Sequence, residues 1–124
     1  MHRHSLELSI SNTFKVVFKS YGYMVILPTM NGEIGVLYDH VPIITSLKFG
    51  LIKLLDETSN IMSSFYIDSG VVQVNSFGVQ VLCQEYHDAS EVHYEKINEK
   101  IQLLSSLGSK DRKIAFYQKI LTQI

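Results

Sequence analysis

Apolar and polar side chains alternate at period two in several short segments of the first 87 residues. In residues 6–10, leucine and isoleucine alternate with glutamate and serine, which is typical of a strand buried on one face. Similar apolar or alternating segments follow at residues 21–27, 51–55, 65–67, 72–74 and 79–83. Pro28 is expected to end the second segment, and turn-forming residues separate the later ones. The pattern therefore predicts short strands joined by turns, as in a sandwich or a barrel.

From residue 88 onward, the spacing of apolar residues becomes that of helices. Asp88, with Glu91 three residues later, is expected to cap a first helix. The apolar residues of this helix are Val92, Ile97, Ile101 and Leu104. After a break at Gly108, Ser109 is expected to cap a second helix. Its apolar stripe is Ile114, Tyr117, Leu121 and Ile124, broadened by Ala115, Phe116 and Ile120. The short break favours an antiparallel two-helix hairpin.

The second helix is basic, since it carries Lys110, Arg112, Lys113 and Lys119 against Asp111 alone. Residues 1–90, by contrast, carry more acidic than basic side chains. A basic amphipathic helix suits an acidic protein surface or an anionic membrane, but the same pattern also describes a solvated polar face. The sequence leaves both interpretations open. Each helix is too short to be stable alone in water, so its apolar stripe must pack against another element or a partner.

Length and composition bound the class of protein. The 124 residues suffice for a β domain at residues 1–87 and a helical hairpin at residues 88–124. The net charge of −1 argues against a nucleic-acid partner, and no apolar run approaches the ~18 residues of a membrane span. The N-terminus lacks the apolar core of a signal peptide, so we expect the chain to stay where it is made. The lone Cys83 fits a reducing compartment and a buried position.

Motifs for catalysis are absent from the sequence. It holds no phosphate-binding loop, no dinucleotide fingerprint and no nucleophile elbow, and its five histidines lack the spacing of metal ligands. We therefore expect no enzymatic activity, no cofactor and no metal. His40 lies between Asp39 and Pro42, where it can hydrogen-bond a turn or contact a partner, and the first role is favoured. A small enzyme that uses His40 and Asp39 is the weaker alternative.

One glycine-rich segment resembles a known protein family. The epsilon subunit of bacterial F-type ATP synthases, called delta in mitochondria, has the pattern G-E-x-G-V-L-P-G-H-x-P-L-L-T-x-L-x-x-G. The residues that fall on it here are Gly32, Glu33, Gly35, Val36, Leu37, His40, Pro42, Thr45, Leu47 and Gly50, with Ile43 and Ile44 replacing the leucines. Residues 65–74 are similar to the family's Y-x-x-G-G-x-x-E-V, and residues 79–83 to its V-T-V-L-A. The order and spacing hold over almost the whole chain.

The resemblance implies a fold and a role. The expected fold is an N-terminal β-sandwich followed by two C-terminal helices, in a non-catalytic subunit of the rotor's central stalk. The sandwich is implied to bind the gamma subunit and to rest on the c ring, which couples proton-driven rotation to ATP synthesis. The helices are implied to lie on the sandwich or to extend along gamma and restrain ATP hydrolysis. The implied location is peripheral, at the cytoplasmic face of a bacterial inner membrane.

The resemblance also implies site residues, position by position. Glu33 falls in the loop that meets the c ring, and His40, Val41 and Ile44 fall where the sandwich faces gamma. In inhibitory members of the family, basic residues of the second helix approach acidic segments of the alpha and beta subunits. The matching residues here are Lys110, Arg112, Lys113 and Lys119.

Three departures from the family pattern change these expectations. Tyr38 and Asp39 replace the usual Pro-Gly, so we expect a turn of different shape. Residues 92–97 lack the acid, the arginine and the alanine of the family's ATP-binding I-D-x-x-R-A motif, so we expect no specific ATP site. The tail that ends at Ile124 is shorter than in strongly inhibitory members, which leaves inhibition open. The alternative function is a free-standing β-sandwich binding module with a helical hairpin for dimerisation.

Overall fold

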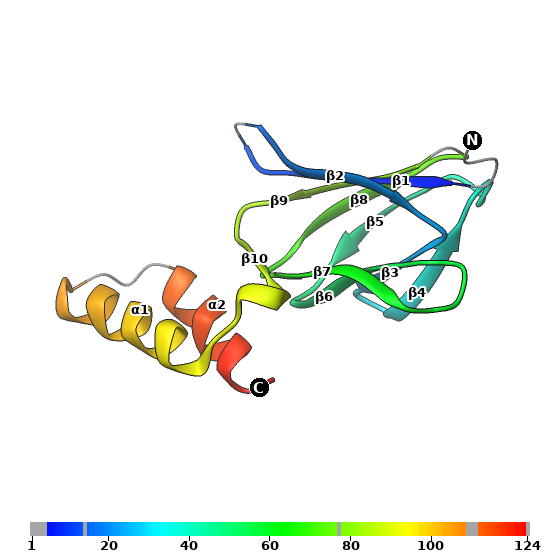
Figure 1. Cartoon of the computed structure of the whole chain (residues 1–124). Coiled ribbons are helices and arrows are strands. Elements are labelled where there is room, and N and C mark those ends of the chain that lie inside the picture. Colours follow the sequence, from blue (N-terminus) through cyan, green and yellow to red (C-terminus); the bar gives the residue numbers. More distant parts are fainter. Residues whose placement is uncertain (1–4, 14, 77, 109–111, 124) are drawn as a thin grey trace.

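The computed structural model describes residues 5–13, 15–76, 78–108 and 112–123, which form a curled sheet followed by two helices (Figure 1). The strands are β1 (Leu6–Ser11), β2 (Val16–Gly22), β3 (Met24–Thr29), β4 (Gly32–Leu37), β5 (Ile43–Leu47), β6 (Gly50–Leu55), β7 (Ile61–Ile67), β8 (Gly70–Val74), β9 (Gly78–Cys83) and β10 (Tyr86–Asp88). The helices are the 3₁₀ turn η1 (Ala89–Glu91), α1 (Tyr94–Ser106) and α2 (Arg112–Leu121).

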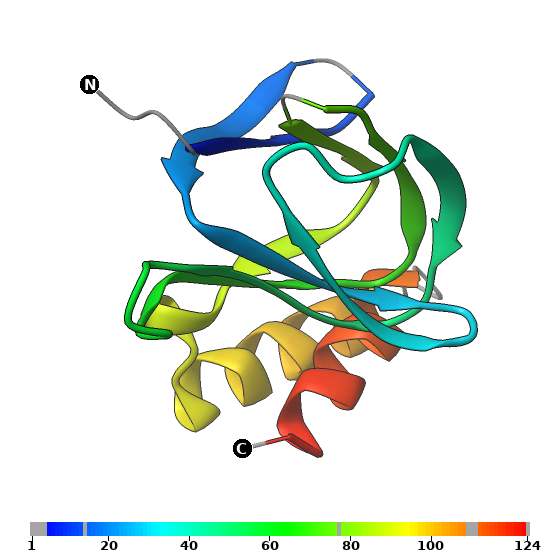
Figure 2. The same ribbon diagram turned by 90° about the vertical axis from the view of Figure 1, so that its right-hand side faces the viewer.

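The strands form one continuous sheet that folds over into two layers (Figure 2). Its order is β10-β7-β6-β3-β5-β8-β9-β1-β2, and β4 pairs with β3. Strands β3 and β5 share only the pair Thr29–Leu47, and the sheet passes from one layer to the other there. At the other side, the rings of Phe18 on β2 and Phe65 on β7 lie 4.6 Å apart and join the two layers.

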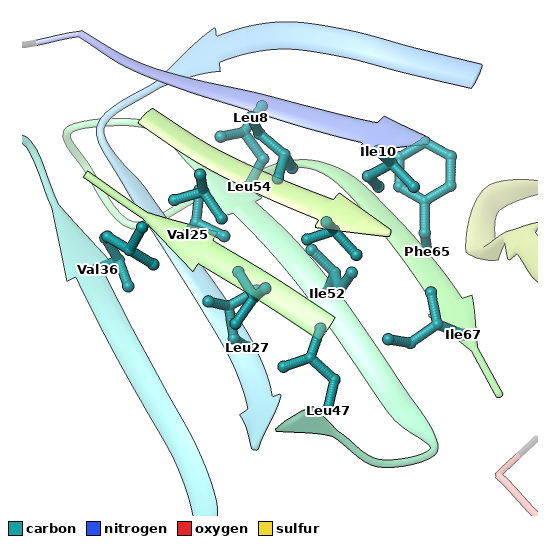
Figure 3. Packing of buried hydrophobic residues seen from close by; sticks show 14 of the residues in the cluster. Leu8, Ile10, Val25, Leu27, Val36, Leu47, Ile52, Leu54, Phe65 and Ile67 are labelled. Atoms are coloured by element: carbon teal, nitrogen blue, oxygen red, sulfur yellow. The ribbon is translucent and has the colours of Figure 1, made fainter. Parts of the chain in front are cut away.

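The core lies between the two layers. Buried residues alternate along β1, β8 and β9 as the sequence predicts; on β1, for example, Leu6, Leu8 and Ile10 are fully buried. On β7, by contrast, the three successive residues 65–67 are all buried. Figure 3 shows side chains from both layers meeting in this space, among them Leu8 of β1 and Ile52 of β6. Because one side of most strands is used for this core, the other side of those strands is left for solvent or for partners.

Strand β3 continues through Pro28 to Thr29, so the expectation that Pro28 ends the strand was wrong. Pro28 pairs with Glu33 of β4, and its carbonyl accepts a hydrogen bond from the Lys48 N–H at 2.9 Å. On the opposite side, β6 pairs with β3 only as far as Ile26. The sheet therefore needs no N–H donor at position 28, and a strand tolerates proline at such a position.

The first helix begins later than the sequence predicts. The Asp88 carboxylate accepts the Ser90 N–H at 2.9 Å and caps η1, a single 3₁₀ turn, rather than α1. Val92, which we placed in the helix, has extended backbone geometry, and α1 starts at Tyr94. The β-branched Val92 thus separates a short turn from the helix proper.

The helices α1 and α2 pack side by side in opposite directions at one end of the sheet, beside β10 and β7 (Figure 1). We call this pair the helical hairpin. It rests on the sheet through a second cluster, separate from the core, in which Phe116 and Ile120 are buried. The sequence placed these two residues at the margin of the apolar stripe, but they are its centre. The predicted cap Ser109 and the stripe residue Ile124 lie outside the described residues.

Aromatic rings dominate the contact between hairpin and sheet. Phe49, in the turn before β6, lies 6.1 Å edge-on from Phe116 and 6.0 Å from the near-parallel ring of Tyr66 on β7. The Lys119 ammonium lies 5.6 Å from the centre of the Phe49 ring. The hairpin is therefore docked on the sheet, and the expected β-sandwich followed by an antiparallel two-helix hairpin is confirmed.

We expect the substitution Phe116→Ala to weaken docking of the hairpin by about 3 kcal/mol, because it removes a buried aromatic ring from a small contact. Amide hydrogen exchange of α2 should then accelerate by roughly a hundredfold, while that of β1 and β8 stays slow. Leu107→Ala, at a position 72% exposed just after α1, is the matched control and should leave exchange unchanged. Equal acceleration in the sheet and in α2 would show that the hairpin does not move independently.

Candidate docking surfaces

The outward side of the layer β5-β8-β9-β1-β2 carries apolar residues. Val71 of β8 pairs with Leu82 of β9, Leu82 pairs with Ser11 of β1, and Ser11 pairs with Val16 of β2. Ile44 of β5 pairs with Gln73 of β8. Because Gln73 lies two residues from Val71 on the same face, Ile44 is the diagonal neighbour of Val71. The four exposed apolar residues Val16, Ile44, Val71 and Leu82 therefore share one face, which we call the outer patch.

The apolar side chains of the outer patch are highly exposed to solvent. The exposed fractions are 55% for Val16, 74% for Ile44, 46% for Val71 and 54% for Leu82. Gln73, Gln80 and Lys19 lie beside them on the same face by register. An apolar centre with a polar rim is the usual composition of a protein-binding surface.

Of the residues implied to face gamma, Ile44 belongs to the outer patch, and His40 and Val41 lie in the turn that leads into β5. The His40 Nδ1–H donates to the Val41 carbonyl at 2.7 Å, within the turn. Asp39 has a positive φ of 65° and its N–H donates to the Ser76 carbonyl at 2.9 Å. The turn is thus held by the His40 side chain and by backbone hydrogen bonds, and it presents Val41 as one of the most exposed apolar side chains.

Glu33, implied to contact the c ring, lies at the tip of the hairpin formed by β3 and β4. It is exposed, and its carboxylate lies 3.9 Å from the Lys53 ammonium. The Thr29 hydroxyl donates to the Gly32 carbonyl at 2.5 Å and closes the turn, whose tip presents the exposed Met30. The tip therefore combines a charge with an apolar side chain on a short, well-defined turn.

The basic residues of the second helix do not all face solvent freely. Lys119 lies over the Phe49 ring, as described above, and Lys113 lines a hollow together with Glu85 and Tyr86 of the sandwich. Arg112 is the first residue of α2, and its side chain is not described. Lys110 lies outside the described residues. In the docked conformation, part of this basic surface is therefore turned toward the chain's own sandwich.

Groups with shifted pKa values have structural explanations. Burial raises the pKa of the Cys83 thiol to about 12, and the nearby Asp68 and Glu85 add to the effect. Hydrogen bonds from the Asn60 backbone and the Thr58 side chain lower the pKa of Asp56, which closes the turn between β6 and β7.

Among the described residues, no three His, Cys, Asp or Glu side chains are placed to hold a metal ion. The expectation that residues 92–97 form no specific ATP site stays a prediction.

Sequence reasoning missed three members of the outer patch: Val16, Val71 and Leu82. The signal was present in the alternation itself. Val72 and Val74 are buried, so Val71 must point outward, and the same argument applies to Leu82 between Val81 and Cys83. An apolar residue in the outward phase of a strand marks a candidate interface.

None of the helices that the structure describes combines the length and the apolar character that crossing a membrane requires.

An apolar outer patch, a charged tip between β3 and β4 and a docked pair of helices thus belong to a domain of the β-sandwich class. The family model for the beta-sandwich domain of the ATP synthase delta/epsilon chain matches residues 5–89. The chloroplastic ATP synthase epsilon chain of Euglena gracilis is 34% identical over 92 residues, which cover 74% of this chain and 68% of that relative. The chain therefore belongs to the ATP synthase delta/epsilon family, as its motifs predicted.

Two solved structures share the fold. A chain in the OSCP/F1/c-ring assembly of Euglena gracilis mitochondrial ATP synthase is similar with a TM-score of 0.67 at 20% identity, covering 97% of this chain and 76% of that one. A chain in the central stalk/c-ring structure of Tetrahymena thermophila mitochondrial ATP synthase has a TM-score of 0.58 at 13% identity, with 94% and 96% covered. Both similarities extend beyond the sandwich into the helices.

We expect Cys83 to be unreactive in the folded chain. With a thiol pKa of about 12, only about 10⁻⁴ of the molecules carry a thiolate at pH 8, and the side chain is also buried. Labelling with an aromatic disulfide reagent should be slower than in the urea-unfolded chain by a factor of about a thousand or more. Rapid labelling of the folded chain would reveal an accessible nucleophile and reopen an enzymatic interpretation.

Proposed function

We propose that this chain is the epsilon subunit of the central stalk of an F-type ATP synthase and performs no catalysis itself. Its sandwich links the gamma subunit to the c ring, so that proton-driven rotation is coupled to ATP synthesis without slippage. The single observation that carries the proposal is the outer patch on a rigid sandwich of the delta/epsilon family. A preformed surface of this kind transmits force through shape and apolar contact, which requires no reactive group.

The outer patch and the neighbouring turn form the proposed contact with gamma. Ile44 and Val41 are the most exposed apolar residues of this region, and burial of such side chains contributes about 1.5–3 kcal/mol each. His40 holds the turn that presents Val41, so its role in this contact is to position that side chain.

The β3–β4 tip forms the proposed contact with the c ring. Glu33 supplies a charge at the tip, and Met30 supplies an adaptable apolar side chain. The tip and the outer patch belong to different layers of the sandwich, so the two partners can bind at the same time. The proposed location is the membrane surface at the c ring, on the cytoplasmic face of a bacterial inner membrane.

Restraint of ATP hydrolysis by the helical hairpin is a further part of this proposal. For α2 to approach acidic segments of the alpha and beta subunits, Lys119 must first leave the Phe49 ring, and Phe116 and Ile120 must leave the sheet. Docked and released hairpins would thus correspond to unrestrained and restrained hydrolysis.

We expect Ile44→Asp to weaken binding to the purified gamma subunit by at least about tenfold, because a carboxylate would have to lose its hydration in the centre of the contact. Ile61→Asp is the matched control, since Ile61 is 58% exposed and lies on β7, in the other layer. Titration calorimetry of both variants measures the difference. If Ile61→Asp weakened binding as much as Ile44→Asp, the outer patch would not be the gamma contact.

We expect Glu33→Lys to weaken attachment to the c ring by about twofold to fivefold, the effect of reversing one exposed charge at an interface. Binding of the gamma–epsilon complex to reconstituted c rings measures this. Glu57→Lys makes the same change in the turn between β6 and β7, which lies at the end of β3 away from the β3–β4 tip, and this variant should bind like the unaltered chain. Unchanged binding of Glu33→Lys would move the c-ring contact elsewhere.

A further inference from the structure

His87 occupies the joint between the sheet and the helical hairpin. It lies on β10 and pairs directly with Tyr66 of β7, so both side chains point to the face on which the hairpin rests. The His87 ring meets the Tyr117 ring of α2 at an angle of 90°, with 6.3 Å between their centres. The contact that holds the hairpin therefore includes a side chain that titrates near neutral pH.

The docked conformation suits a neutral His87 ring. The Nε2 atom is buried and has no hydrogen-bond partner among the described residues. In a neutral imidazole this atom can be an acceptor without a partner, which costs comparatively little. In the protonated ring the same atom becomes a charged donor, and burying a charged donor without a partner costs considerably more.

Some charged groups around His87 raise its pKa and others lower it. From α1, the Lys100 ammonium lies 5.5 Å from the centre of the Tyr117 ring, directly beside the joint. His93 and Lys96 line the same hollow as His87 and Lys100. Of these groups, the positive charge of Lys100 opposes protonation of His87. The carboxylates that favour it belong to Asp88 of β10 and Glu91 of η1.

Burial is the largest effect on His87 and lowers its pKa below the ordinary value, and the Lys100 charge lowers it further. A hydrogen bond to the Glu91 backbone and the negative charges of the Glu91 and Asp88 carboxylates raise the His87 pKa and offset part of this shift. Tyr117 and Lys100 belong to the hairpin, so release of the hairpin exposes the His87 ring and separates it from Lys100. The pKa should then return toward about 6.5.

We propose that His87 is a pH-sensitive latch: the neutral ring permits the hairpin to dock on the sheet, and protonation releases it. The hairpin can respond because it is held by a small cluster that is separate from the core. The latch is a property of the isolated chain and does not depend on the proposed role in the stalk.

The direction of the pH dependence follows from linkage. The docked form has the lower His87 pKa, so it binds fewer protons than the released form wherever the two differ. Docking is therefore strongest above about pH 7, weakens as the pH falls through about 6.5, and levels off below the lowered pKa of the docked form. Each unit of difference between the two pKa values changes the ratio of docked to released chains about tenfold.

Nuclear magnetic resonance of the full chain between pH 8 and pH 5 tests the latch with two signals. The Ile120 methyl resonance reports docking, and the carbon-bound ring protons report the His87 pKa. We expect the docked fraction of the unaltered chain to fall over this window. In His87→Gln, which keeps a polar side chain without titrating, docking should not change with pH. His93→Gln removes the other histidine of the hollow and should retain the pH dependence of the unaltered chain.

A second measurement does not depend on how well His87→Gln docks. In Phe116→Ala, whose hairpin we expect to dock more weakly, the His87 pKa should rise toward 6.5 as the Ile120 methyl resonance reports release, because docking and protonation affect each other equally. The proposal is overturned if the His87 pKa is the same in this variant and in the unaltered chain. It is equally overturned if docking of the unaltered chain is constant from pH 8 to pH 5, or if His87→Gln retains the pH dependence.

Discussion

The structure depends on one apolar core shared by the two layers of a single curled sheet. Because successive side chains of a strand point to opposite faces, filling the core also decides which residues face outward. Burial of Val72 and Val74 on β8 fixes Val71 on the outer side, in the same row as Leu82 of β9. A slip by one residue would exchange the core with the outer patch, so the packing that stabilises the sandwich also defines the surface available to a partner.

The helical hairpin is attached by a different and smaller contact. Phe116 and Ile120 pack on Phe49 and Tyr66, and this cluster does not merge with the core. The sandwich can therefore stay folded while the hairpin leaves it, which allows one chain to combine a rigid link with a movable element. The His87 ring lies in this contact, where a change of one proton alters the balance between docked and released forms.

The sequence predicted most of the strands, the helical hairpin and the family because each has a local signal. It was wrong to join residues 21–27 in one segment, since β2 ends at Gly22 and β3 begins at Met24. Period-two alternation marks strands, and the glycine-rich segment from Gly32 to Gly50 marks the family. Prediction from the sequence failed where the structure of a segment depends on residues that are distant along the chain. Pro28 stays inside β3 because β6 pairs with that strand only as far as Ile26. Phe116 is the centre of the α2 stripe because Phe49 lies opposite to it in the folded chain, which no periodicity of α2 reveals.

We propose that the outer patch docks on the gamma subunit of the ATP synthase. A cryo-electron microscopy structure of the assembled complex that contains this chain tests it most directly. We expect Ile44, Val71 and Leu82 to be buried against the gamma subunit and the tip at Glu33 to touch the c ring. The proposal is contradicted if these three residues remain open to solvent and gamma binds another face of the sandwich.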